Sequence, residues 1–311
     1  MIKFLKGILF LIITLITLFV AYHFLRKNHI ISKQEAIAKY KHAGSEFIKW
    51  NNLDIQVVEQ GKGTTVFLIH GLGGALHEFD LLADSLAKHY KVVRFDLPGF
   101  GLSDGTKDEQ PEFQQVYKDF MHFIINKYST DSCFVVGNSM GGLIAWNAAL
   151  DTSNHIKKLV LLAAAGYEME QMAKENAEWI DKPMIKFLLA KGAPKFVAKM
   201  NVQSCFYHDD AIDPTLYDIK YGMMNKQGNL EWLKKLAKYN NYTDSATIKN
   251  IACPTLIIWG DKDEIIPFNH ASRFKRDIPN SQLITYKDCG HAPMTENYQQ
   301  CSTDIIHFFE K

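Results

Sequence analysis

Val135-Val136-Gly137-Asn138-Ser139-Met140-Gly141-Gly142 is a Gly-x-Ser-x-Gly pentapeptide set directly between two regular elements. The apolar run at residues 133–136 predicts a buried strand, and the Ala- and Leu-rich run at 142–150 predicts a helix. A strand that reverses into a helix over so few residues strains its backbone. Glycine at positions 137 and 141 removes the Cβ atoms that would collide there. The pattern therefore predicts that Ser139 sits on a sharp elbow with its hydroxyl exposed at the carboxyl end of the strand.

A serine hydroxyl is a weak nucleophile, so it needs a nearby base and a third group that orients the base. The pentapeptide alone is also compatible with an ordinary strand-to-helix turn that a serine caps. The wider pattern bears on this choice, because apolar strands alternate with helices from residue 65 to about 165. This alternation predicts a parallel sheet with helices on both faces, and ligands bind beyond the carboxyl ends of such strands. His70, Asp96 and Ser139 all fall at such ends.

Composition restricts the classes of protein to consider. The chain has 311 residues, of which 47% are hydrophobic and 22% charged, enough for one elaborated domain or two small ones. A net charge of +1 gives no electrostatic footprint for nucleic acid. The five cysteines are dispersed without a C-x-x-C pair, which indicates neither a disulfide framework nor a zinc site. We expect no metal, no cofactor and no obligate protein partner.

The N-terminal region carries a long apolar stretch. Residues 7–25 contain no Asp, Glu, Lys or Arg, and a helix of this length spans roughly 28 Å, close to the ~30 Å hydrocarbon core of a bilayer. A cleaved signal peptide needs a shorter apolar region and a small-residue cleavage site, which Tyr22, His23 and Phe24 fit poorly. We therefore predict an uncleaved single-pass anchor within residues 1–29 and a membrane location. Basic residues flank both ends, so the side of the membrane that the protein faces stays open.

The remaining chain divides by pattern. Residues 30–45 are polar and predict a helical neck, and a β-hairpin is expected around Asn51-Asn52. Residues 46–165 and 251–311 form the predicted α/β core. Residues 166–250 show no convincing strand pattern but have helical stretches, dense in Met and aromatic side chains, that prolines and glycines interrupt. A helical insertion between two strands is expected to cover their carboxyl ends as a lid, with a few apolar side chains facing the cleft.

Beyond this insertion the loop after the strand at 255–259 supplies an acid, Asp263, and a later loop supplies His291. The order Ser139, Asp263, His291 resembles the α/β-hydrolase family. Further motifs carry the resemblance: His70-Gly71-Leu72-Gly73-Gly74, Asp96-Leu97-Pro98-Gly99-Phe100-Gly101, the Gly137–Gly142 elbow, Asp263 before Ile266-Pro267, and Gly290-His291. The family fold implied is a mostly parallel eight-stranded sheet with helices on both faces and a helical lid inserted after strand six, here with an added N-terminal transmembrane helix.

The resemblance also implies roles for these residues. Ser139 would attack a carbonyl carbon, His291 would transfer the proton, and Asp263 would hold the imidazole in the correct tautomer. The backbone N–H groups of Met140 and Leu72 would form the oxyanion hole, which stabilises the negative oxygen of the intermediate.

Other titratable residues lie near these motifs. Asp261 is an alternative triad acid, although the resemblance favours Asp263. His70 and Asp96 are interpreted as structural groups of their loops. His77, His89 and His122 lie on predicted helices, and we expect them to be solvated.

The identity of the nucleophile restricts the possible reactions, although one fold can support many different reactions. A serine excludes relatives that use a carboxylate there, the epoxide hydrolases and haloalkane dehalogenases. The anchor, the lid and the Asn-Ser-Met-Gly-Gly elbow look like bacterial membrane-associated lipases and membrane-anchored monoacylglycerol lipases, which implies a small-molecule or lipid ester with an apolar acyl group as substrate. A carbon–carbon hydrolase of ring-cleavage products is the alternative, since these enzymes carry a similar Asn-Ser-Met-Gly-Gly elbow. Their first glycine loop, however, typically contains a proline that residues 70–74 lack, and they have no reason to be anchored. A non-catalytic binding protein is the third possibility, but such proteins commonly lose a triad member.

Overall fold

The computed structural model describes residues 13–15, 17–18, 21–22, 29–167, 182, 190–239 and 244–311. Its centre is one sheet of eight strands: β1 (Glu46–Trp50), β2 (Leu53–Gln60), β3 (Thr65–Ile69), β4 (Lys91–Phe95), β5 (Cys133–Asn138), β6 (Ile156–Leu162), β7 (Thr255–Gly260) and β8 (Ser281–Tyr286). Their spatial order is β1-β2-β4-β3-β5-β6-β7-β8. In this order the neighbouring strands from β4 to β8 pair in parallel, whereas the β1–β2 and β2–β4 pairs are antiparallel. Only β2 therefore runs opposite to the other strands. The predicted eight-stranded, mostly parallel sheet is confirmed.

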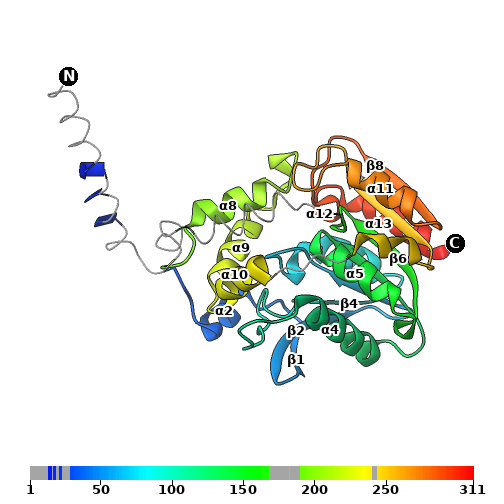
Figure 1. Cartoon of the computed structure of the whole chain (residues 1–311), viewed down its shortest axis with the longest axis horizontal. Coiled ribbons are helices and arrows are strands. Elements are labelled where there is room, and N and C mark those ends of the chain that lie inside the picture. Colours follow the sequence, from blue (N-terminus) through cyan, green and yellow to red (C-terminus); the bar gives the residue numbers. More distant parts are fainter. Residues whose placement is uncertain are drawn as a thin grey trace.

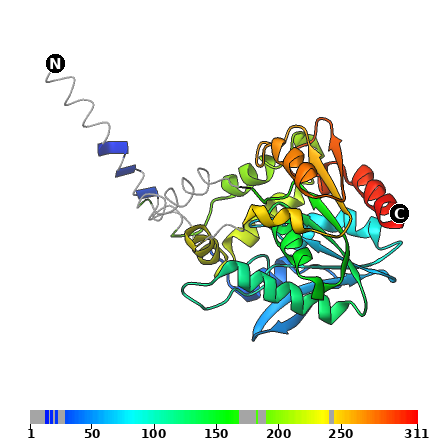
Figure 2. The ribbon, with the colours of Figure 1, turned by 45° about the vertical axis from the view of Figure 1, so that its right-hand side comes forward.

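Helices cover both faces of this sheet, as Figure 1 and, turned by 45°, Figure 2 show. Successive side chains of a strand point to opposite faces, so β3 divides its residues between two cores. Phe67 and Ile69 pack with α4 (Phe113–Tyr128), α5 (Met140–Leu150) and α11 (Asn269–Asp277). Val66 and Leu68 pack with α3 (Asp80–Leu86) and α13 (Tyr298–Glu310). Both faces of the central strands are thus buried, which explains why these strands are apolar without alternation.

The hairpin of β1 and β2 turns at the predicted pair of asparagines. Asn51 and Asn52 have φ angles of 47° and 64°, and positive φ at both central residues is characteristic of the type I′ turn that two-residue hairpins favour. Asparagine tolerates this left-handed conformation better than most residues. The predicted β-hairpin is confirmed.

Helix α2 (Lys33–Tyr40) lies within the predicted neck. A capping box begins it, because the Ser32 side chain accepts from the Glu35 N–H while the Glu35 carboxylate accepts from the Ser32 N–H. Ala36 and Tyr40 are buried, and Tyr40 packs where a Cβ on Gly222 of α9 (Thr215–Asn225) would overlap its ring. The neck is therefore part of the folded body.

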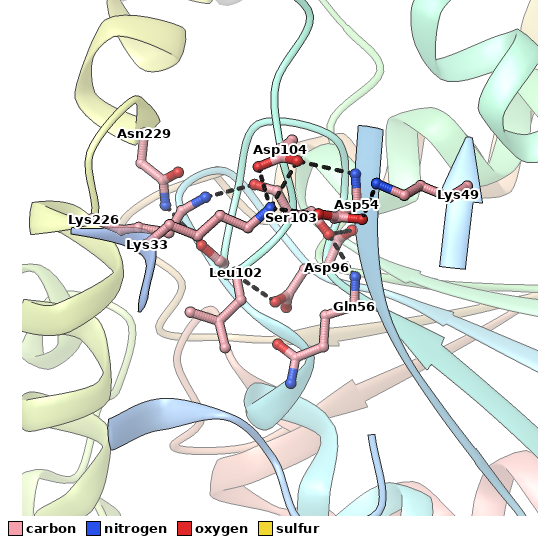
Figure 3. A network of polar contacts seen from close by, with 11 residues as sticks. Lys33, Lys49, Asp54, Gln56, Asp96, Leu102, Ser103, Asp104, Lys226 and Asn229 are labelled. Atoms are coloured by element: carbon pink, nitrogen blue, oxygen red, sulfur yellow. Dashed lines mark hydrogen bonds and ion pairs between the residues drawn. The ribbon is translucent and has the colours of Figure 1, made fainter. Parts of the chain in front are cut away.

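A polar network joins the neck to the core and to the insertion (Figure 3). The Lys33 ammonium donates to Asp54 of β2 at 2.9 Å and to Asp104, in the loop after β4, at 2.8 Å. Lys226, which follows α9, donates to the carbonyl oxygen of Ser103 at 2.7 Å. Lys226 is only 3% exposed, and burial lowers its pKa to about 8. The network thus connects three parts of the chain that are remote in sequence.

Between β6 and β7 the described residues form α8 (Lys195–Gln203), η3 (Asp209–Ala211), α9, α10 (Asn229–Tyr239) and η4 (Ser245–Asn250). Helices α2, α9 and α10 lie together at one end of the molecule (Figure 1). Of the predicted helical insertion at 166–250, residues 168–181, 183–189 and 240–243 lie outside the described residues. The boundaries of the predicted domains and the lid role of this insertion stay predictions.

Most of the predicted anchor at 1–29 also lies outside the described residues, which include only 13–15, 17–18, 21–22 and 29 of it. Across the part of the chain that is described, no helix combines the length and apolarity needed to cross a bilayer.

One local prediction, the solvated position of His77, is wrong. The helix expected to carry His77 and His89 is present as the 3₁₀ turn η1 (Leu76–Phe79) followed by α3, which ends at Leu86. His89 and His122 are exposed as expected, but His77 is buried. The ring of His42, which follows α2, lies with its centroid 5.5 Å from that of His77. Burial in this position lowers the pKa of His77 to about 4. The neck segment, remote in sequence, therefore covers a side chain that its local pattern assigns to solvent.

Candidate active site

Ser139 stands at the junction of β5 and α5 with φ 54° and ψ −119°. A non-glycine residue in such a conformation stores strain of about 1–3 kcal/mol, and strain of this kind concentrates at functional sites. A Cβ on Gly137 would overlap the carbonyl oxygen of Gly141, and a Cβ on Gly141 would overlap that of Ile69. The predicted strand, turn and helix are confirmed, together with the steric reason for both glycines.

The structure brings His291 and Asp263 into direct contact. Nδ1 of His291 lies 2.8 Å from Oδ2 of Asp263, and both side chains are almost fully buried. The second carboxylate oxygen of Asp263 accepts from the backbone N–H groups of Ile265 at 2.8 Å and Ile266 at 2.9 Å. Together these contacts hold the carboxylate in one fixed orientation.

Asp261 lies elsewhere in the same loop. Its Oδ1 accepts from the backbone N–H of Asp288 at 2.7 Å, and its Oδ2 lies 3.6 Å from the ammonium of Lys262. Of the two acids that follow β7, Asp263 is the one that contacts His291.

Two backbone contacts hold His291 beside the elbow. Its carbonyl oxygen accepts from the side-chain amide of Asn138, the residue before Ser139, at 3.1 Å. Its N–H donates to the carbonyl oxygen of Cys205, in the insertion, at 2.8 Å. Ser139 and His291 both line one cavity, so the predicted nucleophile and base open into the same space.

The loop after β3 packs against the elbow. A Cβ on Gly71 would lie 3.2 Å from the Cβ of Ser139, so glycine permits this close approach. Leu72 and Met140 line the same cavity. Met140 is the first residue of α5, and the first N–H groups of a helix have no acceptor within it. The oxyanion role of both residues stays a prediction.

His70 and Asp96 organise these loops, as the sequence suggests. Nδ1 of His70 pairs with the carbonyl oxygen of Gly71 at 2.8 Å, and Nε2 accepts from the N–H of Leu97 at 2.9 Å. With both ring nitrogens occupied and burial lowering its pKa to about 4, His70 is not available as a base. Asp96 accepts from the N–H groups of Leu76 and Leu102, and burial raises its pKa to about 6.

The cavity has a volume of about 980 Å³. Helix α5 contributes Leu143 and Ile144, and α10 contributes Leu233 and Leu236, so much of the wall is aliphatic. From the aromatic- and Met-rich insertion, Phe206 and Met223 also face it. The described part of the insertion therefore forms one wall of the space that Ser139 and His291 open into.

Two charged cavity residues, Glu78 of η1 and Lys220 of α9, are absent from the sequence-based set of candidates. No local signal distinguishes them: Glu78 lies in a stretch that predicts an exposed helix, and Lys220 is one of many lysines in the chain.

Comparison with known proteins places these observations in context. Residues 64–298 match the family described as the alpha/beta hydrolase fold. The chain is 30% identical to Lipase 3 of Moraxella sp. strain TA144 over 79% of this chain and 77% of that protein. It is 25% identical to 2-hydroxy-6-oxo-6-(2'-aminophenyl)hexa-2,4-dienoic acid hydrolase of Metapseudomonas resinovorans over 91% of this chain and 97% of that protein. A crystal structure of a bacterial membrane phospholipase A, 21% identical, covers 100% of this chain and 98% of its own with a TM-score of 0.72.

Proposed function

The chain belongs to the α/β-hydrolase family, and we propose that it is a serine hydrolase that cleaves carboxylic esters of apolar acyl groups. The observation that carries the proposal is the buried His291–Asp263 pair, in which His291 lines the same cavity as Ser139 on its strained elbow. A nucleophile, a base and a group that orients the base are the parts that serine catalysis needs.

In this mechanism the Ser139 hydroxyl attacks the ester carbonyl carbon while Nε2 of His291 takes its proton. Asp263, bonded to Nδ1, keeps the imidazole in the tautomer that leaves Nε2 free and stabilises the imidazolium that forms. The imidazolium then donates its proton to the departing alcohol, which leaves an acyl-enzyme. Water attacks the acyl carbon, again with His291 as base, and releases the acid and the Ser139 hydroxyl.

The oxyanion of each tetrahedral intermediate needs donors that are in place before the reaction. We assign this role to the backbone N–H groups of Leu72 and Met140, because both residues line the cavity that Ser139 lines. One such donor is worth about 2.7–4 kcal/mol in other hydrolases. No metal or cofactor enters these steps.

The aliphatic cavity wall supports an apolar acyl group. Burial of one CH₂ contributes about 0.8 kcal/mol, so a cavity of about 980 Å³ can select for chain length. We assign the insertion a lid role, since Phe206, Met223 and Leu236 are part of this wall. We also assign residues 1–29 to a membrane anchor on the basis of their apolar sequence, which makes lipid esters accessible substrates.

A chain-length series tests this function. For p-nitrophenyl esters with acyl chains from two to sixteen carbons, we expect kcat/KM to rise from acetate into the medium range and then to level or fall. Replacement of Leu236 by Ala should flatten this dependence. Acetate as the best substrate, with no effect of the Leu236→Ala change, would contradict the apolar acyl assignment.

The second candidate function is hydrolysis of a carbon–carbon bond in a ring-cleavage product. The similarity to the dienoic acid hydrolase supports it, because that similarity covers more of both proteins than the similarity to Lipase 3 does. Incubation with 2-hydroxy-6-oxo-6-phenylhexa-2,4-dienoate, followed by the loss of its dienoate absorbance, tests this candidate. Turnover that exceeds that of every ester would favour it, and no turnover of either class would favour a non-catalytic binding protein.

A further inference from the structure

Two opposite charges line the cavity beside the glycine loop of residues 71–74. Nζ of Lys220 donates to the carbonyl oxygen of Gly73 at 2.9 Å and lies 3.9 Å from Oε1 of Glu78. The second distance is longer than a hydrogen bond, so the two groups attract each other without closing into a contact pair. The side chains keep 28% (Glu78) and 13% (Lys220) of their surface accessible, and both line the cavity.

Glu78 lies between the glycine loop and the segment that carries His291. A Cβ on Gly74 would overlap the carboxylate of Glu78. On its other side, the hydroxyl of Thr295, in α12 (Pro293–Glu296), donates to the backbone carbonyl oxygen of Glu78 at 3.0 Å. This helix follows His291 almost directly. In the proposed mechanism His291 gives its proton to the leaving alcohol, and its charge acts on the Glu78 carboxyl, so the alcohol part of a substrate is expected beside this pair.

The charges of the pair restrict what can bind there. Burial raises the pKa of the Glu78 carboxyl above its ordinary value, while Lys220 and His291 oppose this effect. A ligand carboxylate at this point would gain from Lys220 but would be repelled by Glu78. A neutral hydroxyl fits both groups, because it can donate to the carboxylate and accept from the ammonium at once.

We infer that Glu78 and Lys220 form a subsite for a free hydroxyl on the alcohol part of the substrate, which selects esters of polyhydric alcohols such as monoacylglycerols over esters of simple alcohols. This inference rests on the proposed ester hydrolysis. It assigns substrate selection to two residues outside the Ser139, His291 and Asp263 set.

The test compares two esters of the same acid, 1-monooctanoylglycerol and ethyl octanoate. The measured quantity is the ratio of their kcat/KM values in the wild-type protein and in the Lys220→Met and Glu78→Gln variants. Loss of one hydrogen bond to a charged group should lower this ratio about tenfold in Lys220→Met. Glu78→Gln, which keeps the size and one acceptor oxygen, should lower it less. Lys199→Met and Glu231→Gln, at exposed positions outside the cavity lining, are the matched controls and should keep the wild-type ratio.

This ratio of kcat/KM values distinguishes recognition of the substrate hydroxyl from structural support of the glycine loop. Lys220 also holds the carbonyl oxygen of Gly73, so Lys220→Met is expected to slow both esters to some degree. Equal losses for both esters in both variants would overturn the inference and leave the pair a purely structural role. If Lys220→Met does not fold, the ratio in Glu78→Gln alone decides. A wild-type protein that hydrolyses both esters equally would refute this subsite only, whereas one that hydrolyses neither would refute the proposed function as well.

Discussion

Replacement of Asp263 by Asn tests the assignment of the triad acid, and its effect follows from the hydrogen bonds of the carboxylate. Oδ1 of Asp263 accepts from two backbone N–H groups, those of Ile265 and Ile266. In the Asp263→Asn variant the amide oxygen must keep this place, because an NH₂ group there would face two donors. The NH₂ group then occupies the position of Oδ2, 2.8 Å from Nδ1 of His291.

This arrangement forces the wrong tautomer on His291. Nδ1 must accept a hydrogen bond from the amide, so the imidazole proton moves to Nε2, the nitrogen that should take the proton of Ser139. The same change in a trypsin-like triad lowers kcat by about 10⁴, which corresponds to about 5.4 kcal/mol at 1.36 kcal/mol for each factor of ten. We expect Asp263→Asn to lose activity of this order on p-nitrophenyl butyrate.

Asp261→Asn is the matched control in the same loop. Its amide oxygen can still accept from the N–H of Asp288, and only the partly exposed contact with Lys262 is weakened. Surface ion pairs of this kind contribute about 0–1 kcal/mol, so kcat should stay within a few-fold of wild type. Thermal unfolding of both variants shows whether they are folded. A large loss in Asp261→Asn beside a near-normal Asp263→Asn would refute the reasoning.

Three further predictions concern the nucleophile, the N-terminus and acid stability. Ser139→Ala should abolish labelling by a fluorophosphonate probe and lower kcat by about 10⁶; persistent labelling would contradict the assignment. The full chain should sediment with membranes, whereas a chain that begins at residue 27 should be soluble and still hydrolyse p-nitrophenyl butyrate. The shorter chain keeps the backbone hydrogen bonds that join residues 29–31 to residues 191, 225 and 227. N-terminal sequencing that finds the apolar segment removed would indicate a signal peptide instead. The pKa of His77 is lowered to about 4 in the folded state, so the unfolded state binds its proton first, and stability should fall as pH drops from about 6.5 towards 4. Linkage predicts that this effect lowers the free energy of unfolding by about 2 kcal/mol at pH 5. In urea unfolding, the decrease in this free energy between pH 7 and pH 5 should be smaller for His77→Phe than for wild type. An equal decrease in both proteins would exclude His77 as its source.

The elbow, the hairpin and the parallel sheet could be predicted because their causes are local. Glycines at 137 and 141 are needed wherever a strand turns this sharply into a helix, and two asparagines suit positive φ at 51 and 52. Continuous apolar runs such as β3 and β7 indicate strands with both faces covered. These signals lie within a few residues of the structure that they specify.

The choice of the triad acid cannot be made from neighbouring residues in the sequence. Asp261 and Asp263 follow the same strand two residues apart, and only resemblance to a family favours Asp263. The structure distinguishes them through their partners: His291 lies 28 residues from Asp263 in the chain, and Asp288 lies 27 residues from Asp261. Which of two neighbouring carboxylates is the triad acid therefore depends on the distant loop that each carboxylate contacts.

The surroundings of His77, Glu78 and Lys220 follow from tertiary packing. The sequence pattern predicts a solvated His77 and does not distinguish Glu78 or Lys220 from other charged residues. His77 is buried beside His42 of the neck, and Lys220 reaches Gly73 across 147 residues of chain. A side chain's burial and charge environment are set by the segments that pack on it from elsewhere, whereas secondary structure is set largely by neighbouring residues in the chain. The sheet, the elbow and the candidate catalytic residues could thus be predicted from sequence patterns, whereas the packing of remote helices sets which charged side chains share the cavity with these residues.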